Sequence, residues 1–306
     1  MSKEITFLVT IFEAIPTPMI KRILLIVATL AQVGHTYSQS ADSSNDDKNH
    51  IKAGIQYISN QSYLGRTDSS RLPVIVPSVN FETHLGFYIK ASGYVNLSRN
   101  NQGFDGISIE PGYEFSKGNW NGSISFIKNF ISDSSNLIIA PMKASFEFYL
   151  ENENKIITPS VGAEYIFSNE GNDFIFYAGL AKLITLAKDE KGFSATLEPS
   201  VSAGGGTQSF YYSYLKHYAQ NGHSKSKGTG QNNNSVPLGQ TLKEESQQFG
   251  ILSTGFEFPV SLTKGKLEWK TTPALEAPLN LANEGAEGAQ KEKPYWYISS
   301  ELVYTF

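Results

Sequence analysis

The sequence predicts an all-β fold, an antiparallel up-and-down transmembrane β-barrel of 12 strands. From residue 50 onward, apolar and polar residues alternate with a period of two in one segment after another, and no stretch shows sustained helical periodicity. Most of these segments run over about 10 to 14 residues, which exceeds the ~5–6 usual in soluble strands and suffices for a tilted strand to cross a bilayer. The connections alternate between short turns and longer loops, as in barrels whose two rims face different compartments.

The composition excludes several classes of protein. The chain has 306 residues with 25 Lys and Arg, 29 Asp and Glu, and no Cys, which excludes disulfides, thiolate metal sites and cysteine nucleophiles. A net charge of −4 gives no general case for nucleic acid as a partner. A mean hydropathy of −0.26 excludes a bundle of membrane helices but is compatible with a membrane barrel, where only alternate residues meet lipid.

Residues 1–40 have the three parts of a secretory signal peptide. A basic start at 19–22 precedes an apolar run over 23–31, and small residues follow just before residue 41. The apolar run is about half of the ~20 residues that a spanning helix needs, so a signal peptide is favoured over a membrane anchor. Met19 is the expected natural start. The polar, acidic segment 41–49 is expected to be a disordered lead to a barrel domain over 50–306.

The loop lengths distinguish a barrel from a soluble β-sandwich, in which short and long connections are not expected to alternate along the chain. Every second connection is a short turn, whereas the longest connections, 60–72, 98–104, 205–246 and 278–293, all fall between the short ones. The predicted strands cover 50–59, 73–82, 86–97, 105–116, 119–131, 137–150, 155–167, 173–186, 192–204, 247–262, 265–277 and 294–306.

Prolines inside the predicted strands are the main objection to this assignment, because each removes a ladder hydrogen bond. In a barrel without edges, they are expected to mark bulges that bend the strand. The alternative is that the strand boundaries are wrong. The six residues are Pro77, Pro111, Pro141, Pro159, Pro199 and Pro273.

The last predicted strand places Trp296 and Ile298 on one face with Leu302, Tyr304 and Phe306. This pattern resembles the C-terminal assembly signal of outer-membrane β-barrel proteins. Together with the blocks YLGR (63–66), EPSV (198–201) and PALEAP (273–278), it makes the chain resemble uncharacterised Gram-negative outer-membrane β-barrel proteins. The resemblance implies an outer-membrane location and recognition by the barrel-assembly machinery, with Leu302, Tyr304 and Phe306 as the signal. It implies no substrate and no active site.

If the apolar faces meet lipid, the opposite faces line the lumen. Carboxylates dominate there, and an acidic lining favours cations where water passes. The alternative is that the charges pair with one another and fill a narrow barrel. The candidate selectivity residues are Glu110, Glu114, Lys143, Glu147, Glu164, Glu198, Glu268, Lys270 and Glu301.

The loop over 205–246 opens with Tyr211, Tyr212, Tyr214 and Tyr218, followed by lysines and histidines. One interpretation is an external platform that binds sugars or stacked rings and the phosphates of lipopolysaccharide. The other is that the tyrosines extend the strand pair and belong to the aromatic belt at the membrane interface.

No catalytic arrangement is expected, nor a cofactor or metal site. Outer-membrane phospholipases use a Ser-His pair, but His223-Ser224 lacks the motif that surrounds that pair. The sequence therefore predicts a narrow, cation-preferring passive channel for small solutes, or a structural barrel without conductance. A surface ligand-binding protein acting through loops 205–246 and 278–293 is the alternative, and an outer-membrane hydrolase is a weaker one. Outer-membrane lipid, lipopolysaccharide, the barrel-assembly machinery and small solutes are the expected partners.

Overall fold

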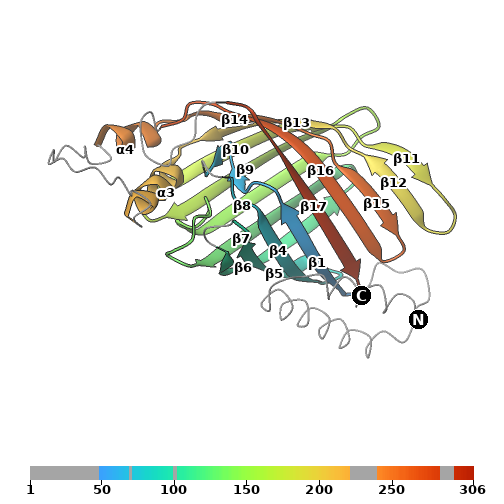
Figure 1. Cartoon of the computed structure of the whole chain (residues 1–306). Helices are drawn as coiled ribbons and strands as arrows, with labels where there is room; N and C mark the ends of the chain where they lie inside the picture. Colours follow the sequence, from blue (N-terminus) through green and yellow to red (C-terminus); the bar gives the residue numbers. More distant parts are fainter. Residues whose placement is uncertain (1–47, 69–70, 99–101, 221–239, 283–292) are drawn as a thin grey trace.

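The computed structural model describes residues 48–68, 71–98, 102–220, 240–282 and 293–306 (Figure 1). The predicted signal peptide and residues 41–47 of the predicted lead lie outside these residues.

A single antiparallel sheet closes on itself into a barrel, because β17 pairs with β1 on one side and with β16 on the other (Figure 1). The ring has 12 wall strands, which confirms the predicted fold class. In order, the wall consists of β1 (His50–Ile58), β4 (Val74–Glu82), β5 (Phe87–Asn96), β6 (Gly103–Lys117), β7 (Trp120–Ile131), β8 (Met142–Asn152), β9 (Thr158–Ser168), β10 (Asn172–Ala181) with β11 (Ile184–Lys188), β12 (Phe193–Leu197) with β13 (Ser200–Gly206), β14 (Gly250–Glu257) with β15 (Val260–Lys264), β16 (Leu267–Pro278) and β17 (Tyr295–Thr305).

The prolines do not create bulges, so that prediction is wrong. Pro77 pairs with Ile55 in an unbroken register, and the ladder of β4 with β5 resumes beyond Pro77 without a shift. A proline removes one donor on one side of its strand but adds no residue, so the register survives. Pro111, Pro159 and Pro273 likewise keep their register, whereas Pro141 precedes β8 and Pro199 lies in the break between β12 and β13.

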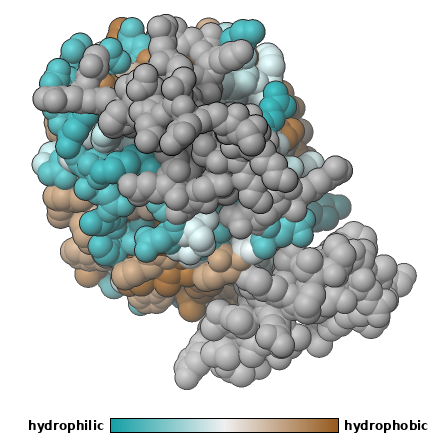
Figure 2. Space-filling model, turned by 60° about the vertical axis from the view of Figure 1, so that its left-hand side comes forward, coloured by the Kyte–Doolittle hydropathy of each residue, from teal (hydrophilic) through white to brown (hydrophobic). Residues whose placement is uncertain are grey.

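The wall has an apolar outer face and a polar inner face, as its alternation predicts. Large exposed hydrophobic side chains recur on one parity of the strands, for example Phe87, Ile89 and Trp296. Figure 2 shows this hydrophobic surface on the flank of the barrel next to a hydrophilic rim. The backbone N–H of Phe306 donates to the carbonyl of Ile51, so the C-terminus lies at the rim with the short turns, called here the short-turn end.

The opposite rim, the long-loop end, carries two helices, α3 (Ser209–Gln220) and α4 (Gln240–Ser246), and a small hairpin of β2 (Ser62–Tyr63) and β3 (Arg66–Thr67). Helix α3 contradicts the absence of helical structure expected after residue 50. Within the described residues, neither helix is long and apolar enough to cross a membrane.

Candidate functional site

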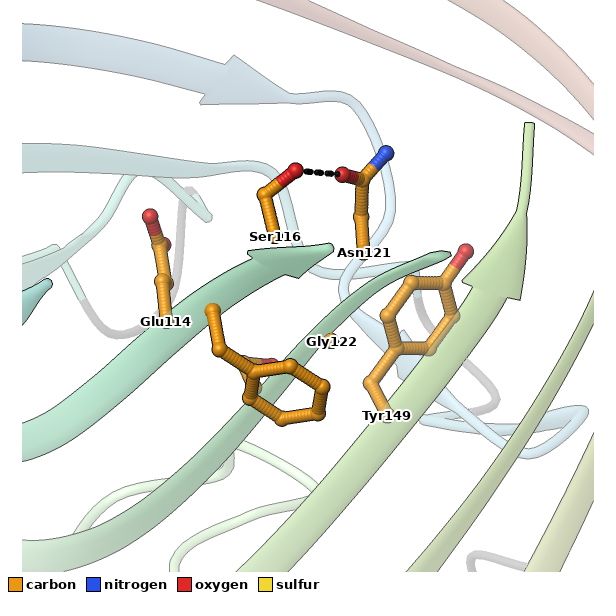
Figure 3. A pocket seen from close by; sticks show the side chains of 7 residues that line it. Glu114, Ser116, Asn121, Gly122 and Tyr149 are labelled. Atoms are coloured by element: carbon orange, nitrogen blue, oxygen red, sulfur yellow. Dashed lines mark hydrogen bonds between the residues drawn. The ribbon is translucent and has the colours of Figure 1, made fainter. Parts of the chain in front are cut away.

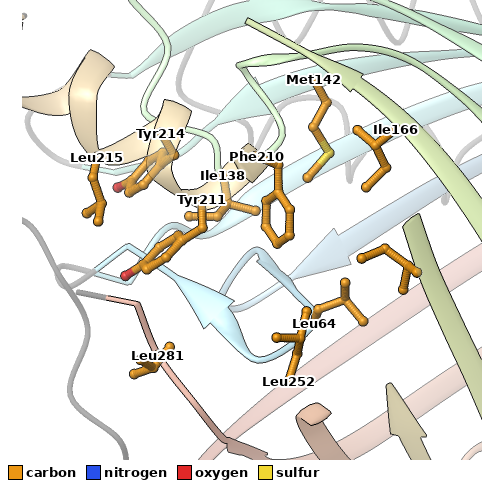
Figure 4. Close-up of a cluster of buried hydrophobic side chains, with 11 residues drawn as sticks. Leu64, Ile138, Met142, Ile166, Phe210, Tyr211, Tyr214, Leu215, Leu252 and Leu281 are labelled. Atoms are coloured by element: carbon orange, nitrogen blue, oxygen red, sulfur yellow. The ribbon is translucent and has the colours of Figure 1, made fainter. Parts of the chain in front are cut away.

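The long-loop end is filled by a plug, defined as residues 60–68, 135–141, 207–217 and 279–282. Its side chains form a hydrophobic core with inner-wall residues (Figure 4). Ile166 and Ile175 contribute from the inner wall, and both are fully buried. Leu64 packs directly over Gly204 of β13, where an added Cβ would come within 2.6 Å of the leucine side chain. The core comprises Leu64, Ile138, Met142, Ile166, Ile175, Phe210, Tyr211, Tyr214, Leu215, Leu252 and Leu281.

The tip of the plug is the tight turn between β2 and β3. Leu64 and Gly65 both have positive φ, 49° and 73°. A Cβ on Gly65 would lie 2.9 Å from the Cβ of Ser253 and 3.0 Å from the Cα of Pro278, so only glycine fits there. The turn therefore seats the hairpin against β14 and β16.

Arg66 is fully buried and links the parts of the plug. Its Nε and Nη2 donate to Oε1 of Gln208 at 3.2 and 2.7 Å, and its Nη1 donates to the carbonyl of Leu252 at 2.8 Å. Nη2 also donates to the carbonyls of Leu279 and Asn280. One guanidinium thus binds Gln208 just before α3, strand β14 and the segment after β16. Arginine can do this because its planar guanidinium carries five N–H donors in fixed directions.

Asp173, on the inner face of β10, holds the first turn of α3. Its Oδ1 accepts from the backbone N–H of Ser209 and its Oδ2 from that of Phe210, both at 2.7 Å, while the hydroxyl of Thr207 donates to Oδ1 at 2.6 Å. A carboxylate at a helix N-terminus satisfies free N–H groups and complements the helix dipole. The wall therefore anchors the helix inside the rim.

Below the plug, Tyr63 of the hairpin reaches a pair of inner-wall groups. Its hydroxyl donates to Oε2 of Glu164 and lies 3.0 Å from the hydroxyl of Tyr177, which donates to the same Oε2 at 2.7 Å. Glu147 lies directly opposite Glu164 in the register of β8 with β9. Burial, and next the charge of Glu164, raise the pKa of Tyr63 well above its ordinary value, so this phenol stays a donor at neutral pH.

The rest of the inner wall is also rich in carboxylates. Glu110 accepts from the hydroxyl of Tyr88 at 2.8 Å, and Lys270 lies directly opposite Glu301 in the register of β16 with β17. Among the described inner-wall side chains, one ion pair forms, between Lys52 and Glu82 at 2.8 Å. Carboxyl groups therefore outnumber lysines among the described inner-wall side chains.

A pocket of about 360 Å³ lies near the short-turn end, lined by Glu114, Ser116, Asn121, Tyr149 and their neighbours (Figure 3). The hydroxyl of Ser116 donates to Oδ1 of Asn121 at 2.8 Å. Tyr149 and Asn121 both donate to Glu151, at 2.9 and 3.2 Å. This rim presents carboxylates and neutral hydrogen-bonding groups together, a surface suited to cations and polar solutes.

Most of the predicted lumen residues lie on the inner face of the wall strands. Glu147 and Glu164 face each other under the plug, Glu110 and Glu114 lie on β6, and Glu268, Lys270 and Glu301 lie on the inner parity of β16 and β17. Glu198 lies in the break between β12 and β13, where its N–H donates to the carbonyl of Pro259.

Lys143 lies in a different setting from the one expected. The register of β8 with β9 shifts between Met142 and Ala144, which leaves Lys143 as the extra residue of a bulge. Met142 is buried in the plug core, whereas Lys143 is exposed. The predicted strand over 137–150 accordingly begins only at Met142, and residues 137–141 belong to the plug.

The tyrosines of the loop over 205–246 do not form an external platform. Tyr211, Tyr212 and Tyr214 are buried in helix α3, and Tyr214 donates to Asp68 of the plug. Tyr218 lies in α3, but its side chain is outside the described residues, as are His223 and Ser224. Of the assembly-signal residues, Leu302 and Tyr304 are exposed on the outer face, and Phe306 follows the end of β17.

Sequence reasoning missed Arg66, Asp173, Tyr63 and Tyr177 as organising residues. One signal was available in the loop before β4. This loop contains Tyr63, Leu64 and Leu72, and several large apolar side chains in a supposed surface loop indicate that the loop is buried. No group of acidic or histidine side chains suited to a metal ion occurs among the residues that the structure describes.

These features define a closed 12-strand β-barrel with an apolar outer wall, an acidic inner wall and an inward-folded plug. No protein-family model matches the chain, and no curated protein matches its sequence. Among solved structures, the chain is similar to a KdgM porin at 7% identity and a TM-score of 0.43, covering 84% of this chain and 99% of that one. It is also similar to an outer-membrane channel from Pseudomonas putida at 8% identity and a TM-score of 0.43, covering 87% and 100%. A third similar structure is the β domain of the Bordetella autotransporter BrkA, at 8% identity and a TM-score of 0.40, covering 85% and 100%.

Proposed function

We propose that this protein is an outer-membrane barrel that acts as a narrow, cation-preferring passive channel for small solutes. The observation that carries the proposal is the acidic inner wall, where Lys52 and Glu82 form one ion pair among many described carboxylates. The apolar outer face supports a position within a bilayer, since exposed hydrophobic surface of this extent is unfavourable in water.

The charge of the wall explains the preference. Carboxylates that line a water-filled passage between low-dielectric walls lower the potential along it, which concentrates cations and repels anions. Glu110 and Glu114 lie on the same face of β6, Glu110 at the middle of the strand and Glu114 towards the short-turn end, so both charges act along the passage. The plug core narrows the other end, so only small solutes and a low conductance are expected.

The experiment is to refold residues 41–306 into lipid, confirm a heat-modifiable gel shift, and measure ion currents across a planar bilayer under a salt gradient. We expect small steps with a cation-selective reversal potential. The double variant Glu110→Gln/Glu114→Gln should move that potential towards zero, because it removes two negative charges from the lumen. Glu190→Gln, in the exposed turn between β11 and β12, is the matched control and should leave the reversal potential unchanged.

Anion selectivity, or selectivity that survives the double variant unchanged, would contradict the charge argument. A folded but silent barrel would instead support the structural alternative, provided that the plug-release variant Arg66→Ala is silent too. Failure to fold in lipid, with good behaviour in plain buffer, would contradict the membrane assignment.

Other roles have less support. Residues 221–239 and 283–292 of the two long loops lie outside the described residues, and the buried tyrosines remove the main argument for a surface ligand platform. No catalytic step is proposed. The C-terminal strand, with Leu302, Tyr304 and Phe306, is proposed as the segment that the barrel-assembly machinery recognises.

A further inference from the structure

The outer face of the wall carries very little charge, and all of it is positive. On the outward parity of the described strands, the charged side chains are Lys117, Lys128 and Lys264, each opposite an outer-face residue in the register. Lys117 and Lys264 end their strands at the short-turn rim. Lys128 is different, because it lies within β7, three residues before its end at Ile131 on the long-loop side.

The side chain of Lys128 extends towards the long-loop rim. Its neighbours across the two ladders are Ile109 and Ala144, both outer-face positions. Its Nζ lies 5.9 Å from the ring centroid of Phe130, which is two residues nearer the rim on the same face. An ammonium in hydrocarbon is costly, so a lysine on this face extends its charge to the level of the lipid head groups.

Lys143 is a second lysine next to this position. It is the extra residue of the bulge in β8 and immediately precedes Ala144, the residue directly opposite Lys128. Bulges re-aim side chains, and this one leaves Lys143 exposed while Met142 enters the plug core. Two lysines on adjacent strands thus stand one residue apart in register.

An aromatic surface lies beside the two lysines. Phe126 and Phe146 are further from the rim, whereas Phe167 lies opposite Ala144, level with Lys128. The rings of Phe126 and Phe146 are 4.8 Å apart between centroids, and those of Phe146 and Phe167 are 6.2 Å apart. Phe146 is 52% exposed, so this cluster is open to contact from outside the barrel. Two cations above an exposed aromatic surface match the anionic head group and acyl chains of one lipid.

We propose that Lys128 and Lys143 bind a phosphate of the phosphorylated glycolipid part of lipopolysaccharide, with its acyl chains against Phe126, Phe146 and Phe167. A phosphomonoester carries more charge than a phosphodiester and offers three acceptor oxygens, so one group can accept from both ammonium groups. The proposal rests on the outer-membrane location in the proposed function, but not on ion conduction.

The test is native mass spectrometry of the folded full-length barrel in detergent, with added lipid A or phosphatidylglycerol as probes. The variant Lys128→Met/Lys143→Met should bind lipid A at least about tenfold more weakly, because each basic residue near an anionic surface contributes appreciably. The control Lys117→Met/Lys264→Met removes the outward lysines of the opposite rim and should bind lipid A as the parent does.

Equal lipid A binding by the Lys128→Met/Lys143→Met variant and the parent, or an equal loss in the control, would overturn the proposal. Equal affinity for phosphatidylglycerol would overturn the choice of a phosphomonoester glycolipid. Because binding is read without a current, a barrel that binds lipid A but does not conduct refutes the channel alone. A barrel that fails to fold in lipid refutes the membrane location on which both depend.

Discussion

Arg66 and Gln208 meet through two hydrogen bonds to a single oxygen, from Nε at 3.2 Å and from Nη2 at 2.7 Å, although 142 positions separate them in the chain. Gln208 in turn donates to the carbonyl of Asn280 at 2.8 Å. The pair therefore joins the hairpin after β1, the start of α3 and the segment after β16. The wall strands close through their own backbone ladders, so the pair stabilises the plug rather than the barrel.

We expect Arg66→Ala to loosen the plug without unfolding the wall. The carbonyl of Leu252 and the amide of Gln208 would lose their buried donor, at a cost on the order of 3 kcal/mol in local stability. Hydrogen exchange should accelerate in α3 while the strand amides stay protected, and any single-channel conductance should rise. Arg71→Ala, at an exposed position in the same loop, is the control. Unchanged exchange in α3 would show that Arg66 does not hold the plug.

The N-terminus of α3 provides a second test. Asp173→Ala removes the acceptor of two backbone N–H groups and should destabilise the plug by ~1–2 kcal/mol. Asp173→Asn keeps one acceptor oxygen and should therefore destabilise the plug less than Asp173→Ala does. The measurement is the rate of limited proteolysis within 207–217, compared between the two variants. Equal cleavage rates in Asp173→Ala and the parent would contradict the anchoring role.

The wall could be predicted from the sequence because its determinant is local. Each wall residue faces either outward or into the lumen, so the alternation of Phe87 to Val95 directly encodes two faces. Alternation also assigns Glu147 and Glu164 to the inner faces of β8 and β9, but their direct opposition depends on pairing between strands. Periodicity cannot supply that register.

The plug could not be predicted for a related reason. Phe210, Tyr211, Tyr214 and Leu215 do have helical spacing, but this stripe covers fewer than two turns and is too short to stand out in the sequence. Tyr212 and Ser213, on other sides of α3, are buried as well. Their burial depends on wall residues distant in sequence, such as Ile175. Lys143 could not be placed from the sequence for a similar reason. Its prediction as a lumen residue assumed strict alternation along β8, and the extra residue of the bulge breaks that alternation.

Alkaline pH should loosen the plug through Tyr63. Its folded-state pKa is raised above the unfolded value of about 10, so the stability that it contributes is complete below pH ~10 and is lost as pH rises further. Tyr63→Phe should reduce the slope of plug stability against pH in this range, measured by hydrogen exchange of α3 amides. Tyr57→Phe, at an exposed outer-face position, should leave the slope unchanged. The same slope in Tyr63→Phe and the parent would exclude Tyr63 as the source.

The three tryptophans provide a direct test of the membrane position of the wall. Trp120, Trp269 and Trp296 all lie on the outer face, with 50%, 45% and 59% of their surface exposed. Trp120 and Trp269 lie near the short-turn end of β7 and β16, whereas Trp296 lies at the long-loop end of β17. Single-tryptophan variants in vesicles should therefore all be quenched by brominated acyl chains and be little affected by a quencher dissolved in water. A quencher confined to one leaflet should separate Trp296 from the other two. Strong aqueous quenching of Trp269, which lies inside its strand rather than in a turn, would show that this flank of the barrel does not meet lipid.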